Sequence, residues 1–173
     1  MTSKDLFTYS EKILKVSQLA AISVFDYIGK QNEFSADRAA VESMRKELNK
    51  YIKSDVHKIH GWLEQIDIDY ILEIQNYQNR SNICGSIGEI GVHHGKLFIL
   101  LNLLTQKNEH SFAIDLFDNQ KENIDRSGLG DLKIFKSYLD SYAVNKENIQ
   151  IISANSLTLG KDFYKEATSD KFK

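Results

Sequence analysis

The sequence predicts an α/β fold, a parallel sheet with helices on both faces, preceded by N-terminal helices. From residue 83 onward, short apolar stretches typical of strands alternate with longer stretches whose apolar residues recur at helical spacing. Strands separated by helices of this length need crossover connections, and such connections produce parallel sheets. Before residue 83, apolar residues recur at helical spacing. We therefore predict a helical N-terminal region (1–58) and an α/β domain (59–173).

The N-terminal region is expected to contain two helices. Apolar residues recur at helical spacing over 5–28, and Gly29 is suited to end that helix. Ser35 is a candidate N-cap for the second helix. Its apolar stripe follows spacings of three and four along Val41, Met44, Leu48 and Tyr51. The stripe is compatible with a homodimer seam formed by the N-terminal helices, but it covers too few heptads to favour that over core packing.

Charge and composition exclude several classes of partner. The 173 residues carry a formal net charge of -2 and a pI near 6.2, so nothing draws the chain toward nucleic acid or an anionic membrane. No stretch has the length of uninterrupted apolar sequence that a membrane span requires, and no basic segment leads into an apolar core at the start. The single cysteine, Cys84, fits a reducing compartment. We expect a cytoplasmic protein.

The α/β domain is expected to begin with Trp62 packed against it as an aromatic anchor. Its predicted elements, in chain order, are a helix over 67–78, a strand over 83–92, a helix over 94–105, a strand over 111–116, a polar loop over 117–130, a helix over 131–142 and a strand over 149–153. The acidic, polar loop over 118–131 is either a lid over a ligand site or a disordered connection.

Chemically distinctive residues follow consecutive predicted strands. Glu89 lies near the end of the first strand, and Gly91 and Gly95 frame the turn after it. Asp115 ends the second strand, where a carboxylate can accept both hydroxyls of a ribose, and Asn155 follows the third. Open α/β sheets bind their ligands at the carboxyl ends of the strands. We therefore predict a nucleotide-like ligand at this edge.

Two ligands compete for this arrangement. A dinucleotide needs its pyrophosphate held at a helix N-terminus, usually by a G-x-G-x-x-G turn. Here His93 stands two positions after Gly91, and Glu89 directly precedes the turn. A carboxylate there repels a pyrophosphate but suits the positive amino and sulfonium groups of S-adenosylmethionine. The charges therefore favour the methyl donor over NAD.

Three segments together resemble a bacterial family of class I S-adenosylmethionine-dependent methyltransferases, whose fold is Rossmann-like and whose members often modify glycans or small metabolites. The segments are residues 88–96 (GEIGVHHGK), 113–120 (AIDLFDNQ) and 122–131 (ENIDRSGLGD), and the resemblance covers roughly residues 60–160. It implies that the methionine side of the donor contacts the turn, the ribose contacts Asp115 and the adenine lies by Leu116, with Asn155 or Ser156 at its edge. The turn residues so implied are Glu89, Ile90, Gly91, Val92, His93 and Gly95.

The same resemblance implies an enzyme that methylates an oxygen or nitrogen of a small molecule or sugar. Such methyltransferases have seven strands, and this chain ends about where the fourth would begin, so we expect either a fragment of a longer protein or a half-sheet that a partner completes. Two further hypotheses stay open. One is a noncatalytic binding or assembly module with a truncated methyltransferase-like fold, and the weaker one is an NAD-dependent oxidoreductase.

The sequence assigns no catalytic residue and no metal site. His57 and His60 have a spacing that metal ligands use on a helix, but no third ligand lies near them in the sequence. His93 and His94 are either bases toward an acceptor hydroxyl or residues that shape the turn and begin the helix. Lys96 is expected to be solvated, and the alternative is a contact with the carboxylate of the donor.

Overall fold

The computed structural model describes residues 3–30, 32–124, 126–160 and 162–163. By its internal contacts the chain divides into two compact units, Met1–Ser54 and Asp55–Lys173, whereas the sequence placed the division after residue 58. N-terminal helices are followed by a three-stranded parallel sheet with interleaved helices, which confirms the predicted fold class. Nowhere in the described part of the chain is a helix both long enough and apolar enough to cross a bilayer.

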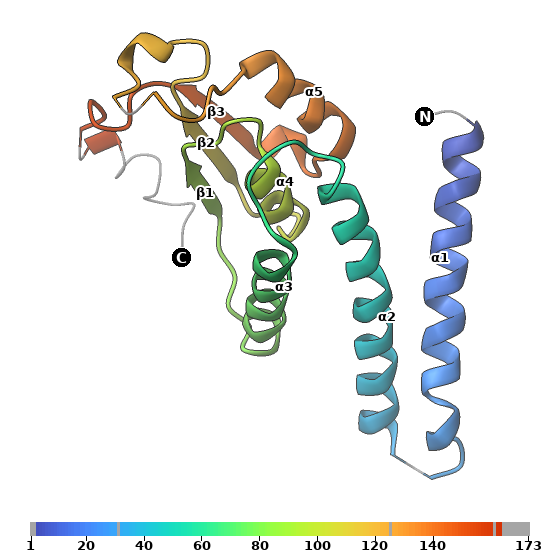
Figure 1. The fold of residues 1–173 in the computed structure, drawn as a ribbon. Helices are drawn as coiled ribbons and strands as arrows, with labels where there is room; N and C mark the ends of the chain where they lie inside the picture. The colour runs from blue at the N-terminus through green and yellow to red at the C-terminus, as the bar shows by residue number, and fades with distance from the viewer. Residues whose placement is uncertain (1–2, 31, 125, 161, 164–173) are drawn as a thin grey trace. The chain divides into compact units, whose positions relative to one another are not determined.

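The first unit is a pair of helices joined by a turn (Figure 1). α1 spans Ser3–Ser23, the 3-10 helix η1 spans Phe25–Tyr27, and α2 spans Glu33–Val56. Gly29, which was predicted to end the first helix, has φ of 75° in the turn between them. The start of α2 is capped by Asn32 and not by Ser35, because Oδ1 of Asn32 accepts a 3.1 Å hydrogen bond from the Ser35 amide.

An ion pair between a buried glutamate and an exposed lysine links the two helices of this unit. Glu47 of α2 is buried, and its carboxylate contacts Nζ of Lys15 on α1 at 3.1 Å and Nζ of Lys50 at 2.6 Å. The hydrogen bonds from Lys50 and Lys15 lower the pKa of Glu47 below its ordinary range. The contact with Lys15 therefore holds α1 and α2 together through a charge that stays ionised at neutral pH.

Most of the predicted apolar stripe of α2 is exposed, whereas Tyr51 is half-buried. Val41, Met44 and Leu48 are each between 37% and 47% exposed. The homodimer through the N-terminal helices stays a prediction.

Among its described residues, the second unit contains one further helix, three strands and two crossover helices (Figure 1). The order is α3 (Gln65–Arg80), β1 (Ile87–Ile90), α4 (Lys96–Leu103), β2 (Ser111–Asp115), η2 (Gln120–Glu122), α5 (Leu132–Tyr142), η3 (Lys146–Asn148) and β3 (Ile149–Ser153). β1 occupies only part of the predicted strand 83–92. The Ile83 amide instead donates to the carbonyl of Gln78, at 2.9 Å, and so completes the end of α3.

The strands form a parallel sheet in the order β1-β2-β3. Ile90 pairs with Ile114, and Asp115 pairs with Ser153, so the carboxyl ends of all three strands meet at one edge. The strand order advances in one direction across the sheet, and crossovers between parallel strands are right-handed. The two crossover helices, α4 and α5, therefore lie on the same face of the sheet. The sequence predicted helices on both faces, and the crossover helices that the structure describes share one.

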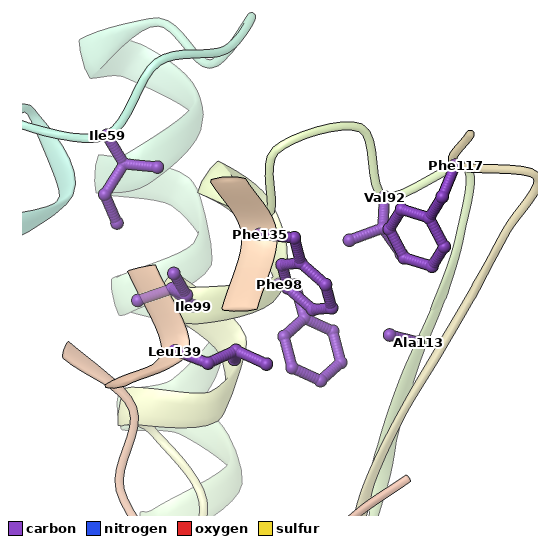
Figure 2. Packing of buried hydrophobic residues seen from close by; sticks show 8 residues of the cluster. All are labelled: Ile59, Val92, Phe98, Ile99, Ala113, Phe117, Phe135 and Leu139. Carbon is purple, nitrogen blue, oxygen red and sulfur yellow. The ribbon is translucent and has the colours of Figure 1, made fainter. Parts of the chain in front are cut away.

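The core of this unit lies between the sheet and the two crossover helices (Figure 2). The ring of Phe98 from α4 meets that of Phe135 from α5 edge-on, with centroids 5.4 Å apart, and Phe117 stacks on Phe135 at 5.5 Å. The buried cluster consists of Ile59, Val92, Phe98, Ile99, Ala113, Phe117, Phe135 and Leu139. Because these aromatic contacts lie beside the glycine turn, they fix the turn against α5.

Candidate functional site

A cavity of about 480 Å³ opens at the edge where the three strands end. This volume lies within the usual range of small-molecule sites. The wall combines residues from the ends of all three strands with the loop after β2 and with Trp62. The lining residues are Trp62, Ile90, Gly91, His93, Ile114, Asp115, Leu116, Gln120, Glu122, Asn123, Ile124, Ser127, Gly128, Ala154, Asn155, Ser156 and Leu157.

In the glycine turn after β1, both glycines have positive φ values, which glycine adopts without strain. Gly91 has φ of 84°, and a Cβ added to it would meet no atom within 4 Å, so its open side leaves room for a ligand. Gly95 has φ of 88° and precedes α4, but an added Cβ there would lie 2.5 Å from the ring of Phe135. Gly91 is therefore open to the site, whereas Gly95 serves the packing of the turn.

Asp115 joins the turn to the end of β2. Its Oδ2 accepts a hydrogen bond from the amide of His93, and its Oδ1 accepts one from the amide of Phe117, both at 2.7 Å. The bond to His93 holds that residue at φ of 55°, a conformation uncommon for a residue with a side chain. Asp115 also lines the cavity, so one carboxylate both shapes the turn and faces the site.

Glu89 lies beside the cavity but not in its wall. It shares the helix-facing row of the sheet with Ala113, and its carboxylate accepts a hydrogen bond from the amide of Phe98. Its Oε2 is buried without a hydrogen-bond partner in the described part of the chain. Burial, together with the nearby charge of Asp115, raises the pKa of Glu89 from 4.5 to about 8.

The described part of the polar loop after β2 forms one wall of the cavity. Internal hydrogen bonds hold it, including one of 2.6 Å from Nδ2 of Asn123 to the carbonyl of Ser127 and another from Gln120 to the Phe117 carbonyl. Asp131 ends the loop as the N-cap of α5. That this loop acts as a lid stays a prediction.

The end of β3 supplies a third wall. Asn155 lines the cavity, and its Oδ1 accepts a 3.0 Å hydrogen bond from the Leu157 amide, which orients the side chain. Ser156 lies beside it in the wall.

The structure brings most of the predicted site residues together. Those that line the cavity are Ile90, Gly91, His93, Asp115, Leu116 and Asn155. Three others support the site from outside its wall: Val92 is buried in the core, Gly95 packs against Phe135, and Glu89 faces the helices. Lys96 does not extend freely into solvent, since its Nζ donates to the carbonyl of Gly61 at 3.2 Å.

The sequence missed two features of this edge. Trp62, expected to be an anchor packed against the domain, is 77% exposed and lines the cavity, with its ring centroid 4.7 Å from that of His93. His60 was paired with His57 by spacing, but its ring instead meets those of His93 and His94. No local pattern signals a contact between residues 34 positions apart.

The histidine rings form a compact group. Nδ1 of His60 lies 3.1 Å from Nδ1 of His94, and the ring centroids of His93 and His94 are 3.8 Å apart. Burial, followed by the adjacent imidazoles, lowers the pKa values of His93 and His94, so both rings favour the neutral form. Neutral imidazoles can accept a hydrogen bond, act as bases or bind a metal ion.

Comparison with known proteins adds no identification. No protein-family model matches the chain, and neither a curated protein nor a solved structure matches it significantly. The resemblance to methyltransferases therefore depends on the residues of the glycine turn and on the two segments after it.

Proposed function

We propose that the α/β domain binds S-adenosylmethionine in the cavity and belongs to an enzyme that methylates an oxygen or nitrogen of a small metabolite or sugar. The observation that carries the proposal is the composition of the cavity wall. It joins Gly91 of the turn, Asp115 at the end of β2 and Asn155 after β3. These are three of the positions that the sequence assigned to a nucleotide-like ligand.

The charges around the turn fit a cationic ligand better than a diphosphate. Asp115 faces the cavity, and Glu89 holds a buried oxygen without a hydrogen-bond partner among the described residues. Lys96, the cation nearest the turn in the sequence, donates to the Gly61 carbonyl. A diphosphate at this turn would face the carboxylate of Asp115, whereas a sulfonium or ammonium group would be attracted to it and would favour the ionised form of Glu89.

Each wall has a role that follows from its chemistry. The two oxygens of Asp115 accept one backbone hydrogen bond each, and a carboxylate has further lone pairs with which to accept ribose hydroxyls. The apolar side chains of Ile90, Leu116 and Leu157 offer a surface for a flat base. S-adenosylmethionine itself supplies the reactive methyl group. The contribution of the chain is to hold the reactants in line and exclude water, which the loop over the site favours.

Calorimetric titration with S-adenosylhomocysteine tests the proposal. We expect binding that is more than about tenfold weaker in Asp115→Ala, where a partly buried polar partner is lost. Asn155→Ala tests the same cavity from a turn outside the core. Asp118→Ala, an exposed acid of the same loop, is the matched control and should bind like the unmodified chain. Absence of binding together with clear binding of NAD would favour the oxidoreductase, and absence of both would favour the noncatalytic module.

The buried carboxyl group provides a second readout of the same binding. With its pKa near 8, Glu89 carries a proton at neutral pH, and a cation bound nearby favours its ionised form. Titration of S-adenosylmethionine in buffers of different ionisation enthalpy should therefore reveal proton release at pH 7. Glu89→Gln should bind without this release. Equal proton release from Glu89→Gln and from the unmodified chain would show that the ligand does not bind close enough to Glu89 to change its protonation.

Methyl transfer is assayed with the 173-residue chain and a panel of small hydroxyl and amino acceptors, sugars included. Methyl transfer that is present in the unmodified chain and lost in Asp115→Ala would support the proposal that the domain belongs to a methyltransferase.

A further inference from the structure

Three imidazoles from two distant segments converge beside the cavity. His60 lies in the segment before α3, and His93 and His94 lie in the glycine turn. One ring nitrogen from each histidine can be chosen so that all three lie within 4.8 Å of one another. In the part of the chain that the structure describes, this is the group of histidine, cysteine and acidic side chains whose spacing fits a metal ion.

We propose that His60, His93 and His94 bind a divalent transition-metal ion of the Zn²⁺ type. Zinc lies about 2.0–2.1 Å from imidazole nitrogens, so two tetrahedral ligands stand roughly 3.3 Å apart. The Nδ1 atoms of His60 and His94 are 3.1 Å apart, close to that separation. One nitrogen from each of the three rings lies within 4.8 Å of the others, so rotation of the rings is what would bring all three to the tetrahedral separation.

The ligand set selects the class of metal. Three neutral imidazoles suit zinc, cobalt, nickel and copper, whereas magnesium and calcium require oxygen ligands. Asp131 and Asp115 act electrostatically on His94, and their negative charges offset the positive charge of a bound cation.

Both segments are held in position without a metal. The amide of His93 donates to Asp115, and the amide of Gly95 donates to the carbonyl of Val92 at 2.8 Å, so the turn carries its two histidines on a fixed backbone. Lys96 donates to the carbonyl of Gly61, which ties the residue after His60 to the start of α4. Ligands arranged in advance in this way lose little freedom when a metal binds.

The site borders the cavity, because His93 belongs to the cavity wall. Zinc sites with three protein ligands leave a fourth position for water or an oxygen of a small ligand. The imidazole cluster does not depend on the methyl donor, so the metal proposal stands or falls separately from the proposed function.

Metal titration of the full 173-residue chain, purified without a polyhistidine tag, tests the proposal. We expect one Zn²⁺ per chain by calorimetry and, with Co²⁺, visible absorption bands typical of tetrahedral nitrogen ligation. His60→Ala, His93→Ala and His94→Ala should each weaken binding by more than about tenfold. The chain has five histidines, and His57→Ala and His110→Ala are the matched controls that should bind normally.

Several results would overturn the proposal. No binding of either metal would mean that the contact between His60 and His94 is only a hydrogen bond between neutral rings. Binding that the three variants leave intact, or that either control removes, would place the metal elsewhere. Far-UV circular dichroism of the metal-free variants controls for folding, and His60→Gln gives a second variant at an exposed position. Parallel titration with S-adenosylhomocysteine keeps failure here distinct from failure of the proposed function.

Discussion

The backbone amide of His93 donates a hydrogen bond to Oδ2 of Asp115 at 2.7 Å, across 22 positions of sequence. This bond connects the turn after β1 to the end of β2, and the same carboxylate accepts a second bond from the amide of Phe117. Both residues line the cavity, and the bond helps to fix the turn that carries His93 and His94. Substitutions at this connection therefore affect stability as well as binding.

Asp115→Ala should lower the free energy of unfolding by about 1–3 kcal/mol, because two partly buried backbone amides lose their acceptor. Urea unfolding followed by circular dichroism measures the change. Asp118→Ala, which alters an exposed carboxylate three residues later, should leave the unfolding midpoint almost unchanged. Equal midpoints for Asp115→Ala and the unmodified chain would show that water replaces these hydrogen bonds without cost.

Gly95→Ala should destabilise the chain more than Gly91→Ala. Both glycines have positive φ, which costs about 1–2 kcal/mol for alanine. At Gly95 the added Cβ also meets the ring of Phe135 at 2.5 Å, and overpacking of this kind costs roughly a further 1–3 kcal/mol. Thermal and urea unfolding of the two variants, compared in one buffer, measure the difference. The opposite order would mean that Phe135 moves more easily than the backbone of Gly91.

Gly91→Ala has an additional expected effect on ligand binding. Gly91 belongs to the cavity wall, and its open side would receive the new methyl group. We expect weaker binding of S-adenosylhomocysteine, together with the loss of stability of about 1–2 kcal/mol that the positive φ causes. A variant that binds as well as the unmodified chain would place the ligand away from this turn.

Glu89→Gln should stabilise the chain near neutral pH. Because the folded-state pKa of Glu89 is raised from 4.5 to about 8, the unfolded chain loses this proton first, and stability falls as pH rises between those values. Removing the ionisable group should increase the free energy of unfolding at pH 7 by up to about 3 kcal/mol, with little difference below about pH 4. Urea unfolding of both proteins across this pH range measures the contribution of Glu89. A gain in the free energy of unfolding that does not vary with pH would contradict the raised pKa.

The exposed stripe of α2 gives the homodimer prediction a direct test. If the stripe forms a seam between two copies, light scattering of the intact chain shows a dimer, and Met44→Glu converts it to a monomer because a charge enters an apolar contact. Glu42→Lys, a charge change at a neighbouring exposed position of the same helix, is the control. A monomeric intact chain would end the prediction.

Much of the α/β unit follows from local patterns. Alternation of apolar stretches predicted the strands and their parallel order, and Gly91, Asp115 and Asn155 were expected at one edge because each follows a strand. Strand bounds were less accurate, since β1 is limited to Ile87–Ile90 once the Ile83 amide bonds to the end of α3. The exposure of two side chains was also not predicted, because it depends on contacts between segments. Trp62 is exposed at the cavity, and Glu89 faces the helices beneath the turn.

Periodicity and chain order were enough to determine a parallel α/β sheet whose distinctive residues share one edge, because side-chain spacing and crossover geometry are local properties. Only the folded chain decided that His60 meets His93 and His94, and that Glu89 keeps a buried oxygen without a partner among the described residues. Contacts of this kind join segments far apart in sequence. They depend on how the turn, α4 and the segment before α3 pack together, and no spacing along the chain encodes that packing.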